Sequence, residues 1–190
     1  MNLTRDLTFA RVAAEQMSDY LYAEVLFYPV GNVDGLPMPQ LTIGAWLETE
    51  WRLSALRPRY PEAIAPVLSA AQAEIRKVRH RLAEQYQHKA RREFRSRLDS
   101  WEIFLDDRRE AAAHDEPYNA PRSGYAERVR MRFCLELLKD DVSQLSAQLD
   151  RLRTLDARLR ARFRPGAFLW EPELAEAAPA DKFWFLYARL

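Results

Sequence analysis

The chain has 190 residues, of which 48% are hydrophobic and 12% aromatic. This composition excludes a disordered chain and is sufficient for one domain with a sizeable core. The 29 basic and 28 acidic residues leave a formal net charge of +1, which excludes long-range attraction of the whole molecule to a polyanion or an anionic membrane. Any binding of an anion must therefore depend on a local cluster of charges.

The first helix is expected from about residue 3 to residue 28, because apolar residues recur there at steps of three and four until Pro29. A second, shorter helix is expected over residues 42–56, with Thr42 as its N-cap. Between them, the segment 31–41 is either a binding loop that offers Asn32 and Asp34, or a rigid connector. The connector is the simpler interpretation, since glycine and asparagine allow positive φ and prolines direct the next helix.

Two long helices are expected next, over residues 61–113 and 123–163, and Pro66 should confine the regular part of the first to the residues after that proline. The apolar positions of the first are heptad-like, then step by four, which acts as a stutter in a coiled coil. A break with two prolines and a glycine separates the helices, so we expect an antiparallel hairpin on the order of 60 Å long. The sequence thus predicts one all-α domain over residues 1–190: a helix pair (1–57), a coiled-coil-like hairpin (61–163) and an aromatic C-terminal segment (164–190).

The C-terminal segment has the highest density of aromatic residues in the chain. Such residues either cap the chain's own core or bind another chain, and aromatic residues with arginine are enriched at interface centres. A long hairpin also leaves an apolar stripe that a second copy would cover. We therefore expect a protein partner or a homodimer, with these candidate partner-binding residues: Trp170, Phe183, Trp184, Phe185 and Tyr187.

A basic run, RKVRHRLAEQYQHKARREFRSR, covers residues 76–97 and contains nine Arg or Lys against two Glu. From Lys89 onward it is typical of a solvated, ion-paired helix face. The part before Lys89 differs, because the expected hairpin places it beside the arginines of the second long helix. The candidate polyanion site there comprises Arg76, Arg79, Arg81, Arg158, Arg160 and Arg162.

Acidic segments of the same chain are expected to cover that site. Residues 1–62 carry eight acids and five bases, a net charge of −3, and residues 165–190 carry four acids and two bases, a net charge of −2. Both segments would converge on the arginine-rich end of the hairpin. Neutralisation within the molecule or a dimer is therefore favoured over nucleic-acid binding, and the run lacks any recognised nucleic-acid-binding signature.

Catalytic and metal-binding patterns are weak. His80, Glu84 and His88 share a helix face, but the two histidines are about 12 Å apart along the axis, too far to share one ion. The carboxylates of Asp99, Glu102, Asp106 and Glu136 are expected to form ion pairs with arginines rather than a catalytic pair. There is no phosphate-binding glycine loop and no nucleophile elbow. We expect no catalytic residue, no metal and no cofactor.

The single cysteine, Cys134, lies in the apolar run MRFCLELL, so a disulfide framework is excluded and a reducing compartment is allowed. No leader-like apolar region and no run of about 18 apolar residues occurs, so a soluble, cytoplasmic protein is expected. The leading hypothesis is a non-enzymatic interaction or scaffold protein that acts through its hairpin and tail. The alternatives are a nucleic-acid or polyanion binder and, more weakly, a helical-bundle enzyme or metal protein.

Overall fold

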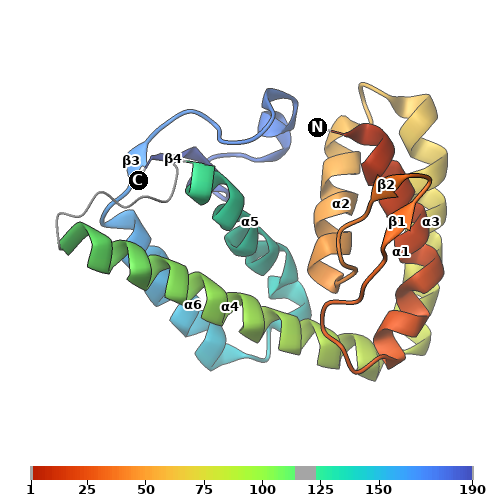
Figure 1. The fold of residues 1–190 in the computed structure, drawn as a ribbon, viewed down its shortest axis with the longest axis horizontal. Coiled ribbons are helices and arrows are strands. Elements are labelled where there is room, and N and C mark those ends of the chain that lie inside the picture. Colours follow the sequence, from red (N-terminus) through yellow and green to blue (C-terminus); the bar gives the residue numbers. More distant parts are fainter. Residues whose placement is uncertain (1, 114–122, 190) are drawn as a thin grey trace. The chain divides into compact units, whose positions relative to one another are not determined.

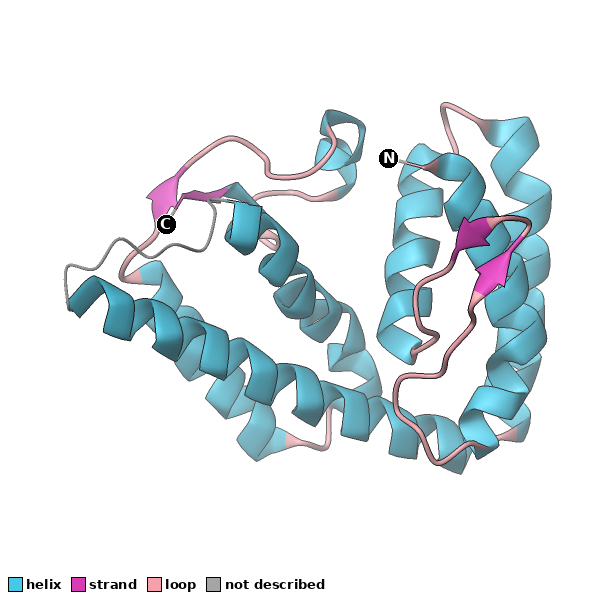
Figure 2. Ribbon diagram, viewed as in Figure 1, coloured by secondary structure: helices cyan, strands magenta, loops and turns pink. Residues whose placement is uncertain are grey.

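The computed structural model describes residues 2–113 and 123–189, and it confirms an all-α fold (Figures 1 and 2). The chain divides into two compact units, Met1–Glu93 and Phe94–Leu190, so the division falls inside helix α4. The expectation that the chain folds as one domain stays a prediction. Within the described ranges, no helix combines the length and the apolar character needed to cross a membrane.

Unit 1 consists of helices and a small, largely exposed hairpin. In chain order its elements are α1 (Leu3–Tyr22), β1 (Asn32–Val33), β2 (Leu36–Pro37), α2 (Ile43–Leu56), α3 (Pro61–Arg81) and the first turns of α4 (Ala83–Ala113). The predicted N-cap Thr42 is confirmed: its Oγ1 accepts a hydrogen bond from Ala45 N at 3.0 Å. The core of the unit contains Phe9, Met17, Tyr20, Ile43, Leu53, Ile64 and Leu68.

The segment predicted as a connector or binding loop is a tight antiparallel hairpin. Asn32 pairs with Pro37 and Val33 with Leu36, while Asp34 and Gly35 at its tip have φ values of 51° and 76°. That turn needs positive φ at both positions, which aspartate tolerates and glycine adopts freely. The first helix ends at Tyr22, earlier than expected, and an extended stretch leads from it to the hairpin.

The first long helix expected from the sequence is two helices. Leu82 leaves the helical region with φ −118° and ψ 44°, so α3 ends at Arg81 and α4 begins at Ala83. Figure 1 shows the first turns of α4 leaving α3 at a steep angle. The prediction for Pro66 is also wrong, because α3 begins at Pro61 and includes Pro66.

Unit 2 contains the rest of α4 and all later elements. These are α5 (Ser123–Leu138), the 3₁₀ helix η1 (Lys139–Val142), α6 (Ser146–Arg160), β3 (Arg164–Pro165), the 3₁₀ helices η2 (Pro172–Ala177) and η3 (Trp184–Tyr187), and β4 (Ala188–Arg189). The strands β3 and β4 pair antiparallel. The second long helix expected from the sequence is therefore also divided, at η1 and the turn after it.

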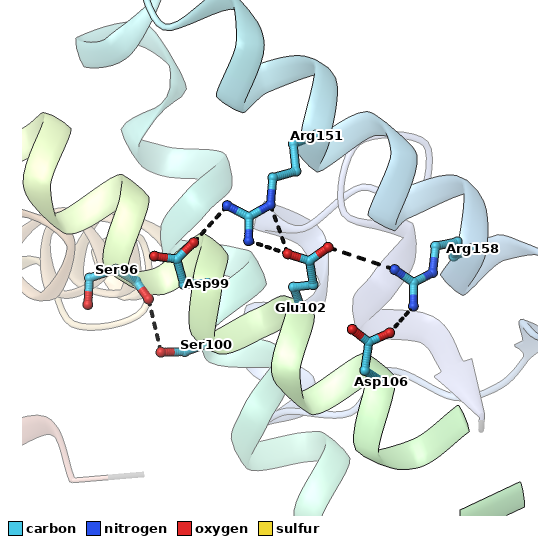
Figure 3. Close-up of polar contacts among 7 residues, drawn as sticks. All are labelled: Ser96, Asp99, Ser100, Glu102, Asp106, Arg151 and Arg158. Atoms are coloured by element: carbon cyan, nitrogen blue, oxygen red, sulfur yellow. Dashed lines mark hydrogen bonds and ion pairs between the residues drawn. The ribbon is translucent and has the colours of Figure 1, made fainter. Parts of the chain in front are cut away.

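The expected hairpin register is wrong. Arg151 of α6 pairs with Asp99 and Glu102 of α4, and Arg158 pairs with Glu102 and Asp106 (Figure 3). Both helices advance in the same direction through these pairs, so α6 runs parallel to α4 rather than antiparallel to it. The turn between α5 and α6 is responsible, because it adds a second reversal of the chain.

Candidate anion-binding site

The six arginines of the predicted polyanion site belong to two different units. Arg76, Arg79 and Arg81 lie in the last turns of α3 in unit 1, whereas the other three lie at and beyond the end of α6 in unit 2. The register that would have joined them is contradicted by the pairs between α4 and α6. Each group of three arginines is therefore a separate candidate site within its own unit.

In unit 2, two of the three predicted arginines are engaged by neighbouring side chains. Arg158 pairs with Glu102 and Asp106. The guanidinium of Arg160 stacks over the ring of Trp184, 3.9 Å from its centroid, and Arg162 is exposed. Neutralisation within the molecule is thus observed here, although the acids come from α4 and not from the N- or C-terminal segments. The expectation that the α4 carboxylates form ion pairs is confirmed.

The five predicted partner-binding aromatic residues form part of the core of unit 2. Phe183, Trp184 and Phe185 are 3%, 8% and 0% exposed, while Trp170 and Tyr187 are half-buried. The ring of Phe183 lies 5.3 Å from that of Phe133 in α5. Binding of another chain through the three buried rings would require them to leave this core.

In unit 1, α3 and α4 carry cations on both sides of the bend at Leu82. We name six of them the bend cluster: Arg76, Arg79, Arg81, Lys89, Arg91 and Arg92. Arg79 stacks over the ring of Tyr86, 4.7 Å from its centroid, and Arg81 donates a long hydrogen bond of 3.4 Å to Ser18 of α1. Arg76, Arg79, Arg81 and Arg92 are exposed. Arg79 and Arg81 therefore have contacts within unit 1 on the α3 side of the bend.

A cleft of about 960 Å³ adjoins the bend cluster. Its walls are the end of α1, residues 21–24, and the first turns of α4, residues 83–92. Lys89, Arg91 and Arg92 are among the lining residues, as are His88 and two carboxylates, Glu24 and Glu84. Within the part of the chain that the structure describes, Arg91 Nε is buried without a hydrogen-bond acceptor.

Lys89 organises one wall of the cleft. Its side chain is buried, its Nζ donates to the carbonyl oxygens of Ala23 and Val25 at 2.5 and 2.6 Å, and it lies 4.7 Å from the ring centroid of Tyr20. Burial, and then the nearby charge of Arg92, lower the pKa of the Lys89 ammonium. Lys89 thus satisfies two carbonyls of the stretch that follows α1.

Arg92 contributes to the same wall, because its Nη1 donates to the carbonyl of Glu24 at 3.0 Å. Together these bonds hold the stretch after α1 against α4. The sequence did not indicate this role, since the bonds connect residues more than 60 positions apart and involve backbone carbonyls.

Large apolar side chains are exposed on that same stretch. Tyr22 lines the cleft and is 67% exposed, while Val25 and Phe27 are 49% and 39% exposed. Among the described residues only Tyr60 and Ile103 are other large hydrophobic side chains with such exposure. An exposed apolar patch beside a cationic cleft is typical of a binding surface.

The weaker metal hypothesis gains no support from the geometry. In residues 2–113 and 123–189, no group of three or more His, Cys, Asp or Glu side chains is arranged to hold a metal ion. His80, Glu84 and His88 are all exposed. His114 lies outside the described residues. Comparison of the chain with protein-family models, curated proteins and solved structures finds no match in any of the three.

Proposed function

We propose that this chain is a non-enzymatic binding protein that holds an anionic partner at the bend cluster and its cleft. The observation that carries the proposal is the local charge at the bend. Residues 76–92, which lie on either side of the break at Leu82, contain seven Arg or Lys and one carboxylate, Glu84. Phosphates and carboxylates bind such clusters through charge-assisted hydrogen bonds.

Several contacts within unit 1 define how much of this charge is available. Lys77 pairs with Glu74, and Lys89 and Arg92 each donate to backbone carbonyls. These carbonyls satisfy hydrogen bonds without removing the positive charge. Within the described residues Arg76 forms no ion pair. The bend cluster therefore retains a net positive charge that an anion would neutralise.

The same reasoning favours the bend over the other two surfaces expected from the sequence. In unit 2, Arg158 is already paired with carboxylates, and Phe183, Trp184 and Phe185 of the tail are buried. A scaffold role through the tail would have to expose that core at a large cost, since burial of each aromatic ring stabilises by about 1.5–3 kcal/mol. Self-association stays an expectation from the apolar pattern.

The proposal is tested by binding of fluorescein-labelled heparin and of a labelled single-stranded 20-nucleotide DNA at about 50 mM salt, where phosphate contacts are strong. The double variant Arg76→Glu with Arg81→Glu should weaken binding of both probes by at least tenfold. The matched control is Arg162→Glu with Arg164→Glu, which makes the same charge change at exposed positions of unit 2. It should retain affinity within about twofold to threefold.

Two results would sink the proposal. One is the absence of measurable binding to either probe at this salt concentration. The other is an equal loss of affinity in the bend variant and the control, because net charge alone would then explain the binding. Circular dichroism of all variants checks that the helices remain folded.

A further inference from the structure

We infer that the anionic partner of the bend cluster is single-stranded nucleic acid, whose bases stack on Tyr22 while its phosphates bind the arginines. The inference rests on the proposed function and names the partner of that same site. It depends on a second property of the cleft, the exposed aromatic surface beside the cations. Proteins that bind single strands combine these two features, a cationic groove and aromatic stacking platforms.

Tyr22 has the placement that stacking requires. It is the last residue of α1, it lines the cleft, and two thirds of its surface is exposed. The stretch after it is fixed by the bonds from Lys89 and Arg92, so the ring projects from an anchored part of the backbone. Phe27 and Val25 extend the exposed apolar surface along that stretch. A pre-ordered ring loses less conformational entropy on binding than a mobile one.

The cations next to Tyr22 suit phosphate groups. Arg91 and Arg92 line the same cleft, and guanidinium groups bind phosphate oxygens through charge-assisted hydrogen bonds. At about 960 Å³ the cleft lies near the upper end of the roughly 300–1,000 Å³ that ligand pockets occupy, so it has room for more than one planar group. Glu24 and Glu84 also line the cleft and oppose an anion, which limits the affinity.

A single strand fits this surface better than the other polyanions. In duplex DNA the bases are stacked inside the helix, so Tyr22 would contribute little to binding. Heparin and polyglutamate supply negative charge but no planar rings. We count one phosphate for each of four arginines of the bend cluster, Arg76, Arg81, Arg91 and Arg92, of which the last two line the cleft. Single-strand binding should therefore lose affinity with a log–log salt slope of about −3, at about 0.7 per phosphate contact.

The experiment compares Tyr22→Ala, Tyr22→Phe and Tyr60→Ala in the full chain. Tyr60→Ala is the matched control, because Tyr60 is also an exposed tyrosine of unit 1 and does not line the cleft. The probes are labelled single-stranded 20-nucleotide DNA and RNA of mixed sequence, the corresponding DNA duplex, heparin and polyglutamate. Tyr22→Ala should weaken single-strand binding by about 5-fold to 150-fold, the loss of one stacked base. Tyr22→Phe and Tyr60→Ala should stay within about twofold of the original chain.

The outcomes separate the inference from the proposed function. If heparin binding depends on Arg76 and Arg81 but Tyr22→Ala leaves single-strand binding unchanged, the inference is overturned and the proposed function stands. Tighter binding of duplex or of polyglutamate than of the single strand also overturns it. If no probe binds, both fail. Unchanged heparin binding in Tyr22→Ala, together with the single-strand loss, supports base stacking.

Discussion

Replacing Arg132 with methionine should destabilise unit 2 by about 3 kcal/mol. The Arg132 side chain is 2% exposed, and its Nε and Nη2 each donate to Asp156 at 2.7 Å. Its Nη1 donates to Glu136 at 2.9 Å, and the guanidinium lies 4.4 Å from the ring centroid of Phe185. Burial lowers the pKa of Arg132, but hydrogen bonds and charge from Asp156 and Glu136 outweigh burial, and the net shift is upward.

The size of this loss of stability depends on which carboxylates lose a partner when methionine replaces Arg132. Methionine fills much of the arginine's apolar volume, but Asp156 loses the counter-charge of Arg132, whereas Glu136 keeps its ion pair with Lys139. Removing one partner of a buried ion pair costs about 3–5 kcal/mol. The side chains of Asp156 and Glu136 keep 18% and 10% exposure, so water reaches them in part. We therefore expect the lower end of that range, roughly a hundredfold change in the folding equilibrium.

Urea unfolding followed by circular dichroism measures the loss, and hydrogen exchange of peptides from α5 and α6 assigns it to unit 2. The control is Arg151→Met, since Arg151 also bridges two carboxylates but is 39% exposed, and we expect a cost within about 1 kcal/mol. Adding Asp156→Asn to Arg132→Met should recover part of the stability, because it removes an uncompensated charge. Equal losses for Arg132→Met and Arg151→Met, or no recovery, would refute the reasoning from burial.

Three further predictions concern buried charges. Burial raises the pKa of Glu136, but Lys139 and Arg132 outweigh burial, so the pKa lies below 4.5. The stability that Glu136 contributes is therefore lost as the pH falls through the folded-state pKa. In urea unfolding, the stability advantage of the original chain over Glu136→Gln should shrink in acid, and a constant difference would contradict this prediction. The pKa of Lys89 lies below 10.5, so the unfolded chain binds the proton more tightly than the folded chain does. Protonated Lys89 therefore lowers the stability of the fold, and this cost is relieved as the pH rises toward 10.5. NMR titration of the Lys89 side chain should show the lowered midpoint, and a midpoint at or above 10.5 would contradict the prediction. Glu93 is fully buried and accepts hydrogen bonds from Thr42 Oγ1 and Gly44 N, at the start of α2, at 2.7 and 2.9 Å. Glu93→Ala should therefore cost about 2–4 kcal/mol in urea unfolding. A loss below about 1 kcal/mol would contradict a role of Glu93 in capping α2.

The sequence predicted the helices well and their breaks poorly. Helix α2 and its Thr42 cap follow directly from local chemistry, and the apolar positions of the long helices are largely buried as expected. The break at Leu82 has no proline or glycine to mark it. Val78, Leu82 and Tyr86 stay buried on both sides of the bend, so the hydrophobic pattern continues across it. Tertiary packing determines this break, and local sequence does not record it.

The candidate site was predicted only in part for a related reason. Arg76, Arg79 and Arg81 were recognised from their density, but their neighbours depend on the bend and on the direction of α6. Tyr22 was expected within the first helix, whereas α1 ends there and leaves it exposed. No local signal connects Tyr22 to Arg91, because contacts between residues nearly 70 positions apart arise only from the fold.

The pairs between α4 and α6 repeat every seven residues, with Asp99 and Asp106 facing Arg151 and Arg158. A slide of α6 by one heptad would bring Arg151 to Asp106, so part of this exposed ladder would survive in a wrong alignment. The same slide would carry Asp156 about 10 Å along its axis. Arg132 would then lose Asp156 and keep only Glu136, and losing this buried pair costs more than losing a partly exposed pair between α4 and α6. The buried pair between Arg132 and Asp156 therefore favours the observed alignment of α6 over this slide.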